Sequence, residues 1–195
     1  MMTPCRLGSG EKDENTNRHS RTSSARGLID EPMTLTFRLY DPSQIETCLD
    51  LFDSNCPAFF ATEERRDYLD FLSTRPLNYF LGLDGNNVVC TFGYSATSDE
   101  YPSLNWIMVI PAYQRSGAGG AMMGQYIDYL VTNQKSFGSI STSQHAEAYF
   151  QRYGAVRIEY EEHGWGEGMH RIEMLLPVTD KPRSRVPITP KRKRA

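Results

Sequence analysis

A glycine-rich turn is the part of this 195-residue sequence that most clearly predicts chemistry. Gly117, Gly119 and Gly120 follow the apolar run of residues 104–110 and precede a long helix-like stretch. Glycine lets the backbone approach a ligand closely, and unpaired N–H groups at a helix N-terminus attract anions. Because a strand leads directly into the turn, the ligand would lie at the carboxyl end of that strand. The turn therefore predicts a site for a phosphate-bearing cofactor, the alternative being a turn that only packs tightly.

Two common phosphate-binding patterns do not fit this turn. It does not match G-x-G-x-x-G, and no Gly-Lys-Ser/Thr follows it as in a kinase-type P-loop. Residues 114–119 (QRSGAG) instead match the motif Q/R-x-x-G-x-G/A, and residues 146–155 (AEAYFQRYGA) resemble A-x-x-x-(Y/F)-E-K-x-G-F. With these two motifs and its order of elements, the chain resembles a bacterial-type member of the GNAT superfamily of N-acetyltransferases over roughly residues 34–177.

The resemblance implies transfer of an acetyl group from acetyl-CoA, as co-substrate, to an amine that attacks directly. The turn would hold the CoA pyrophosphate, and the preceding strand would pair with the pantetheine arm. A main-chain N–H near Val109 would face the thioester oxygen, and losing one such donor costs on the order of 10²–10³ in rate. The implied cofactor-binding residues are Met108, Val109, Ile110, Gln114, Arg115, Ser116, Gly117, Ala118, Gly119 and Gly120.

The general acid is where the sequence departs from the family. The family's tyrosine lies four residues before the signature glycine, and here that residue is Phe150, which has no proton to donate. Tyr149 is the predicted acid, although adjacent helical residues point about 100° apart. Tyr153 lies in the last turn of the same helix, and packing is the alternative role for both tyrosines. A second hypothesis has no side-chain acid, with water protonating the thiolate.

The general base is predicted to be His145, which follows the short strand at residues 139–142. A hydrogen-bonded structural histidine is the alternative, and Asp99 or Glu100 could act instead, directly or through water. Thr142, Ser143 and Gln144 are expected to cap the next helix or to contact the cofactor or acceptor. The residues that flank the last hairpin's turn, where the family often contacts the acceptor, are Glu161, Glu162, His163 and Glu167.

The elements that must position these residues read as β-α-α-β-β-β-α-β-α-β-β. Asp41 followed by Pro42 predicts one helix start, and Thr62 is expected to cap the second helix. The apolar run at residues 104–110 predicts a central strand buried on both faces. A closing hairpin is expected to turn across residues 163–168 (HGWGEG). The predicted fold is α/β, with a GNAT-like mixed, mostly antiparallel sheet of about seven strands and helices on both faces.

The net charge of −3 conceals a strong segregation along the chain. Residues 1–33 carry five basic and five acidic side chains and predict a disordered extension, with Met1 or Met33 as the working start. Residues 34–180, the predicted acetyltransferase domain, hold nine basic and 19 acidic residues, and residues 181–195 hold seven basic residues and no acid. The last segment is expected to be a disordered basic tail.

These charges bear on the partners. A domain of net charge −10 attracts a cationic amine, on a small molecule or a protein, and nucleic acid is expected only through the tail. Four dispersed cysteines (Cys5, Cys48, Cys56 and Cys90) predict cytoplasmic thiols rather than a metal site, and no run is long enough to cross a membrane. A homodimer is possible, and the alternative function is a catalytically degenerate domain that binds acetyl-CoA as a sensor or interaction module.

Overall fold

A computed structural model describes residues 35–95 and 100–178 of the chain. The two predicted disordered segments, residues 1–33 and 181–195, and the candidate base Asp99 lie outside the described residues. Among the helices that are described, none combines the length and the apolar character needed to cross a membrane.

The succession of helices and strands is the one that the sequence predicts. The elements are β1 (Thr36–Leu39), the 3-10 turn η1 (Pro42–Gln44), α1 (Ile45–Asp53), α2 (Glu64–Ser73), β2 (Tyr79–Asp84), β3 (Asn87–Tyr94), β4 (Ser103–Val109), η2 (Pro111–Tyr113), α3 (Ala118–Thr132), β5 (Phe137–Thr142), α4 (Glu147–Gln151), β6 (Val156–Gly166) and β7 (Met169–Pro177).

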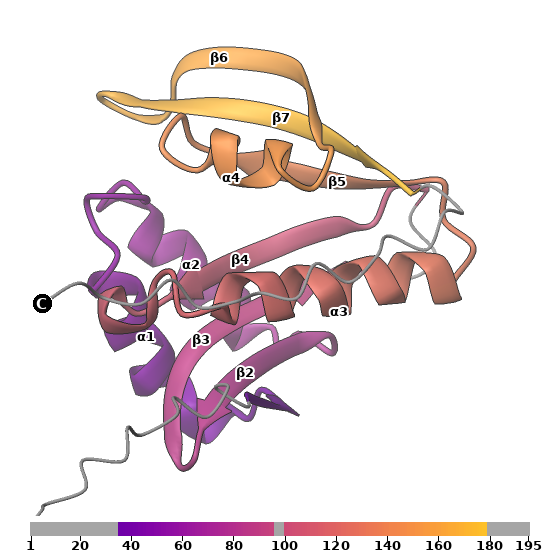
Figure 1. The fold of residues 1–195 in the computed structure, drawn as a ribbon. Helices are drawn as coiled ribbons and strands as arrows, with labels where there is room; N and C mark the ends of the chain where they lie inside the picture. The colour runs from indigo at the N-terminus through magenta and orange to yellow at the C-terminus, as the bar shows by residue number, and fades with distance from the viewer. Residues whose placement is uncertain (1–34, 96–99, 179–195) are drawn as a thin grey trace, which may run out of the picture. The chain divides into compact units, whose positions relative to one another are not determined.

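The strands form one seven-stranded sheet in the order β1-β2-β3-β4-β5-β7-β6 (Figure 1). All neighbouring strands run antiparallel except β4 and β5, which are parallel. The sheet is therefore mixed and mostly antiparallel, which confirms the predicted fold class.

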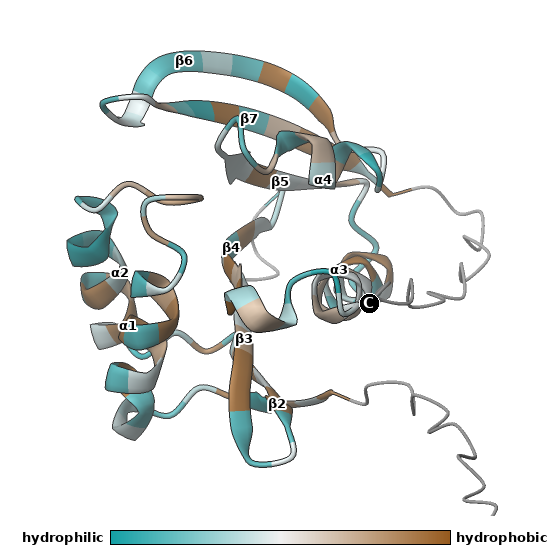
Figure 2. Ribbon diagram, turned by 60° about the vertical axis from the view of Figure 1, so that its left-hand side comes forward, coloured by the Kyte–Doolittle hydropathy of each residue, from teal (hydrophilic) through white to brown (hydrophobic). Residues whose placement is uncertain are grey.

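Helices cover both faces of the sheet, and the sheet separates the core into two clusters (Figure 2). On one face, α3 contributes Met122, Tyr126 and Leu130 to a cluster that also holds Ile140 of β5 and Phe150 of α4. On the other face, α1 and α2 bury a second cluster against β2, β3 and β4, and its fully buried members include Cys48, Phe52, Tyr68 and Leu72.

A β-bulge changes the facing of side chains along β4. Trp106 has a positive φ of 45°, and the pairing of β3 with β4 shifts register beside it. Leu104 consequently lies in the α3 cluster, whereas Met108, four residues later, lies in the α1–α2 cluster. The prediction of a strand buried on both faces is wrong for Asn105, Trp106 and Ile107, which are only half-buried. The reason is that β5 does not continue alongside this part of β4.

The cap before α1 is as predicted, whereas the start of α2 and the length of the last hairpin's turn differ from the prediction. The Asp41 carboxylate accepts the Ser43 N–H at 2.9 Å and caps η1, as predicted. Thr62 does not cap α2: the N-cap position is Glu63, which makes no side-chain cap hydrogen bond, and the Glu64 side chain reaches back to accept the Ala61 N–H at 2.7 Å. The predicted closing hairpin forms between β6 and β7, but its turn is shorter than residues 163–168, because β6 runs on to Gly166 and leaves only two residues before β7.

Candidate active site

The two parallel strands β4 and β5 separate at the centre of the sheet. Their pairing is limited to Ser103 with Ser139 and Leu104 with Ile140, after which the strands diverge (Figure 1). We call the place where they diverge the wedge. From Asn105 onward, β4 therefore has a hydrogen-bonding edge to which β5 contributes no pair.

The backbone of Val109 faces this wedge. Ile110 donates its N–H to Val89 O of β3 at 3.0 Å, and neighbouring residues of a strand direct their polar groups to opposite sides. The Val109 N–H and C=O consequently point toward the β5 side. Gln114 Nε2 lies 3.4 Å from the Val109 carbonyl oxygen, so the predicted motif residue reaches back to the end of its own strand. The Val109 N–H is thereby oriented as the predicted oxyanion donor would need to be.

The glycine-rich turn forms a concentration of backbone donors at the end of β4. Arg115 and Gly117 both have positive φ, of 62° and 105°, and α3 begins at Ala118. The first hydrogen bond within α3 runs from Ala121 N to Gly117 O at 3.0 Å. The N–H groups of residues 118–120 therefore precede the helical ladder, as an anion-binding N-terminus requires.

Tyr149 reaches this turn from α4. A methyl group added at Gly119 would lie 2.7 Å from the Tyr149 hydroxyl oxygen, so the glycine leaves the space that the tip of the Tyr149 side chain occupies. The hydroxyl is buried and makes no hydrogen bond with the described residues. Burial raises the pKa of the Tyr149 phenol far above its usual range, so the group stays protonated. Phe150, by contrast, is buried in the α3 cluster.

The connection between α1 and α2, residues 54–63, contacts both sides of the wedge. Asn55 Oδ1 lies 3.4 Å from Gln114 Nε2, and the Phe60 ring stacks on Trp106 at 6.0 Å between centroids. On the β5 side, Ser143 Oγ donates to Phe59 O at 3.3 Å. We call these ten residues the α1–α2 segment.

A pocket of about 340 Å³ lies between the α1–α2 segment, the start of α4 and the β6–β7 turn. We call it the acceptor pocket. It brings together the predicted base His145 and the predicted turn residue Glu167, and adds Glu63, which the sequence analysis did not place in a site. Its lining residues are Pro57, Ala61, Thr62, Glu63, His145, Glu167, Gly168 and Met169. Neither Glu63 nor Glu167 forms an ion pair with another residue of the described ranges.

Residues 142–144, at the end of β5, form hydrogen bonds to the β6–β7 hairpin rather than capping α4. Gln144 Nε2 donates to Gly168 O at 2.7 Å, and Gln144 Oε1 accepts the His170 N–H at 2.9 Å. Thr142 O accepts the Trp165 indole N–H at 3.1 Å. The N-terminus of α4 has no side-chain cap, so the favoured capping role of residues 142–144 is wrong. The Gln144 amide bonds to backbone groups of the hairpin instead of to the N-terminus of α4.

Glu64 is a buried carboxylate behind the pocket wall. It is 8% exposed, and burial raises its pKa to about 7, with Asp67 and Glu63 adding to the shift. Its carboxylate fixes the backbone of Ala61, which lies 3.2 Å from the position of a methyl group on Gly166 of β6. Two acidic residues in the first turn of a helix are common, so no distinctive pattern points to Glu63 or Glu64 as site residues.

The remaining predicted residues lie apart from the pocket lining. Glu161 pairs with Arg171 at 2.7 Å, and His163 Nδ1 accepts the Gly168 N–H at 2.7 Å, so both shape the hairpin. Glu162 is exposed on β6, 3.8 Å from the His163 Nε2. Glu100 is exposed before β4.

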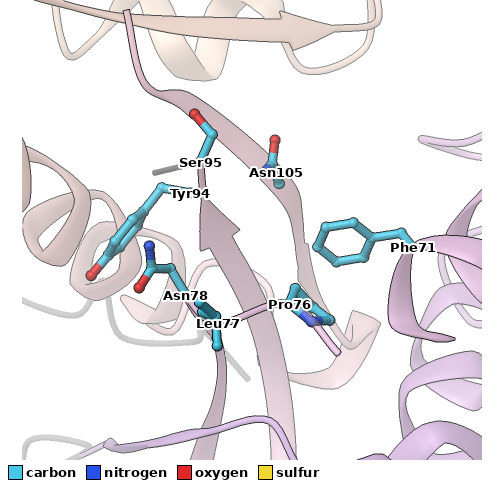
Figure 3. A pocket seen from close by; sticks show the side chains of 7 residues that line it. All are labelled: Phe71, Pro76, Leu77, Asn78, Tyr94, Ser95 and Asn105. Carbon is cyan, nitrogen blue, oxygen red and sulfur yellow. The ribbon is translucent and has the colours of Figure 1, made fainter. Parts of the chain in front are cut away.

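A second pocket, of about 240 Å³, lies beside the beginning of β4 (Figure 3). Phe71 reaches it from α2, Tyr94 from β3 and Asn105 from β4, with Leu77 and Asn78 between them. Its lining has no carboxylate, imidazole or cation. It therefore offers little for proton transfer to or from an amine, and the acceptor pocket is the better candidate.

The wedge and the glycine turn fit the coenzyme that the sequence predicts. A pyrophosphate needs several converging backbone donors, and the start of α3 supplies them. A pantetheine arm carries amides, and the unpaired edge of β4 offers strand-like partners. The Tyr149 hydroxyl, next to Gly119 in the glycine-rich turn, is a further buried polar group that could hydrogen-bond to the coenzyme.

Comparisons with known proteins agree with this geometry. The acetyltransferase (GNAT) family model matches residues 45–155 of the chain, and no curated protein matches the sequence. Among solved structures, Ard1 from Thermoplasma volcanium has a TM-score of 0.62 at 15% identity, covering 75% of this chain and 99% of its own. The ribosomal-protein-S18-alanine N-acetyltransferase from Escherichia coli has a TM-score of 0.60 at 17% identity, with 77% and 98% covered.

A third similar structure, yncA from Salmonella typhimurium, contains acetyl-CoA. Its TM-score is 0.57 at 14% identity, with 75% of this chain and 95% of that chain covered. At such identities the structural likeness shows the fold, and the family model shows the family. The chain belongs to the acetyltransferase (GNAT) family, and its co-substrate is acetyl-CoA, as the motif at residues 114–119 predicts.

Proposed function

We propose that this protein transfers the acetyl group of acetyl-CoA to the primary amine of a cationic acceptor that binds in the acceptor pocket. The observation that carries the proposal is the pocket itself, where an imidazole and two carboxylates without ion pairs line one cavity. The α1–α2 segment that forms one wall of the pocket also contacts both sides of the wedge. An acceptor in the pocket would thus lie beside the strands that bind the coenzyme.

The carboxylates of Glu63 and Glu167 would select the ammonium form of the acceptor and concentrate it. The amine can attack only after it loses a proton, and His145 supplies the one imidazole in the pocket lining, the side-chain type that most often serves as a general base. The attacking nitrogen then meets a thioester whose carbonyl oxygen is directed at the Val109 N–H. This donor stabilises the charge that develops on that oxygen.

The departing thiolate needs a proton, and Tyr149 is the proposed donor. Its phenol is buried and stays protonated, and Tyr153 beside it adds to the raised pKa, so the group carries the proton that a thiolate would need. Acetyl-CoA supplies the activated acetyl group, and the chain supplies orientation, the oxyanion donor and the two proton-transfer groups. The described cysteines, Cys48, Cys56 and Cys90, are free thiols, which supports a reducing location such as the cytoplasm.

The proposal is tested by measuring CoA release with a panel of cationic, neutral and anionic primary amines. We expect turnover with cationic amines and little with anionic ones. Glu63→Gln combined with Glu167→Gln should raise the KM for a cationic amine on the order of tenfold, because each exposed charge pair contributes up to about 1 kcal/mol. The KM of acetyl-CoA should stay unchanged. Glu46→Gln, at an exposed acidic position on α1, is the matched control and should change neither.

A catalytically degenerate domain is the second candidate, and Phe150 at the family's tyrosine position favours it. Such a domain would bind acetyl-CoA as a sensor or interaction module. Calorimetric titration that shows tight CoA binding, together with no CoA release on the whole amine panel, would select this function over catalysis.

A further inference from the structure

The basic segment at residues 181–195 is a feature that acetyl transfer to an external amine does not use. It carries seven basic residues and no acid, and it follows a domain of net charge −10. The acceptor pocket of that domain presents two carboxylates that lack ion pairs within the described residues. We propose that this basic tail is itself an acceptor, so that the chain acetylates Lys191 or Lys193 of its own tail in the acceptor pocket. The inference rests on the proposed function and names one substrate of the same site.

The position of β7 sets which lysines can reach the pocket. Met169, the first residue of β7, lines the pocket, and β7 ends eight residues later at Pro177. At about 3.3 Å per residue, the tail departs roughly 26 Å from the pocket. Lys181 lies four residues beyond Pro177 and extends at most about 14 Å, so it cannot return to the pocket of its own chain.

Lys191 and Lys193 are free of this restriction. They lie 14 and 16 residues beyond Pro177, which allows a fully extended reach of about 46 Å or more. This reach exceeds the roughly 26 Å between the end of β7 and the pocket by about 20 Å, which allows an indirect path. The tail therefore divides into a near part that is out of reach and a far part that is within reach.

Charge favours the far part as well. Residues 191–194 read Lys-Arg-Lys-Arg, so a lysine in the pocket has an arginine on at least one side. Arginine forms strong hydrogen-bonded pairs with carboxylates, and Glu63 and Glu167 are available for such pairs. Attachment to the same chain also keeps the tail at an effective concentration of roughly millimolar, above that of most free competitors.

The reaction balances without a further reactant. The lysine ammonium first gives one proton to the base, and its nitrogen then forms a bond to the acetyl carbon. The carbon–sulfur bond breaks, the nitrogen loses its second proton, and the thiolate takes up one proton to give free CoA. The product is an uncharged amide, so the acetylated lysine loses its attraction to the carboxylates and leaves the pocket.

The test incubates the full chain with acetyl-CoA alone and maps acetylation by peptide mass spectrometry. We expect label on Lys191 or Lys193 well before Lys181, with a first-order rate that is unchanged by about a tenfold dilution of the protein. Lys191→Arg with Lys193→Arg keeps the charge and should remove the label. Lys181→Arg is the matched control and should leave it in place.

Three results would overturn the inference. Label on Lys181 as fast as on Lys191 would refute the reach argument, and a rate that falls with dilution would show transfer between two copies. Equal labelling in the Glu63→Gln, Glu167→Gln variant would show reaction outside the pocket. Butylamine added in a parallel sample distinguishes failure of this inference from failure of the proposed function. Acetylated butylamine with an unlabelled tail would reject only the tail as a substrate. No acetylated product from either the tail or butylamine would reject the proposed function.

Discussion

Replacing Tyr149 by phenylalanine separates a catalytic hydroxyl from a structural one. The substitution removes a single oxygen atom and leaves the ring, which packs against Phe150 and Tyr153 with centroids 5.0 and 5.3 Å away. The removed hydroxyl is buried and has no hydrogen bond to the described residues. The variant therefore loses a polar group whose burial is unfavourable, and it loses no apolar contact.

The two roles predict changes in opposite directions. An unpartnered buried hydroxyl costs about 1–3 kcal/mol, so we expect the free energy of unfolding to rise by about 1 kcal/mol. For a domain of this size that raises the Tm by about 2–4 °C. If the phenol also protonates the CoA thiolate, kcat falls; general acids contribute about 10²–10⁴-fold, and the good leaving group places the expected loss near the lower end. The variant should be more stable and slower.

The measurements are thermal unfolding without ligand and CoA release at saturating acetyl-CoA and amine. Because burial keeps the phenol protonated, the loss of kcat should be the same across the working pH range. Tyr160→Phe, at a half-exposed tyrosine on β6, is the control and should change neither quantity. A Tyr149→Phe enzyme with unchanged kcat would refute the assignment of Tyr149 as acid, and a less stable one would refute the unpartnered hydroxyl.

Two further substitutions test the walls of the site. Glu64→Gln keeps an acceptor for the Ala61 N–H but removes the buried charge. Because folding raises the pKa of Glu64 from 4.5 to about 7, the wild type loses stability as the pH rises from 4.5 to 7. In denaturant titrations the variant should be about 3 kcal/mol more stable above that range and equally stable well below it. Gly119→Ala places a methyl group 2.7 Å from the Tyr149 oxygen, so the Tyr149 side chain must shift. Overpacking of about 1–3 kcal/mol outweighs better helix propensity, and we expect weaker CoA binding by calorimetry. Combining Gly119→Ala with Tyr149→Phe should recover part of both losses, and strictly additive effects would contradict the contact.

The proposed coenzyme half of the site follows from the sequence alone because its residues are contiguous. Residues 108–120 contain the edge of β4, the turn and the first turn of α3, so one short stretch of sequence holds the backbone donors. The same locality explains why the order of elements was predicted correctly: each strand and helix has its own periodicity. Asp41 and Pro42 likewise determine a helix start from neighbouring residues alone.

The failures have a different physical origin. The β-bulge at Trp106 lies in the pairing of β4 with β3, and a sequence pattern with period two does not reveal the extra residue. Thr62 has the right side chain for a cap, but the N–H groups of Glu64 and Arg65 already donate to the backbone carbonyls of Ala61 and Thr62, at 3.1 and 3.2 Å. The hairpin turn was predicted too long because glycines within β6 resemble turn residues; Gly166 instead gives room for Ala61.

The acceptor pocket could not be predicted for a related reason, and this limits what the sequence says about the substrate. Its walls come from three segments, residues 57–63, His145 and residues 167–169, of which the first and last are more than 100 residues apart. Gln144 joins two of them through backbone atoms of Gly168 and His170, and Ser143 joins the third through the backbone of Phe59. Hydrogen bonds to backbone atoms do not depend on the identity of the side chains that they position. The pocket can therefore exchange Glu63 or Glu167 for other residues without losing its walls, and acceptor charge can change on this scaffold while the coenzyme turn remains the same.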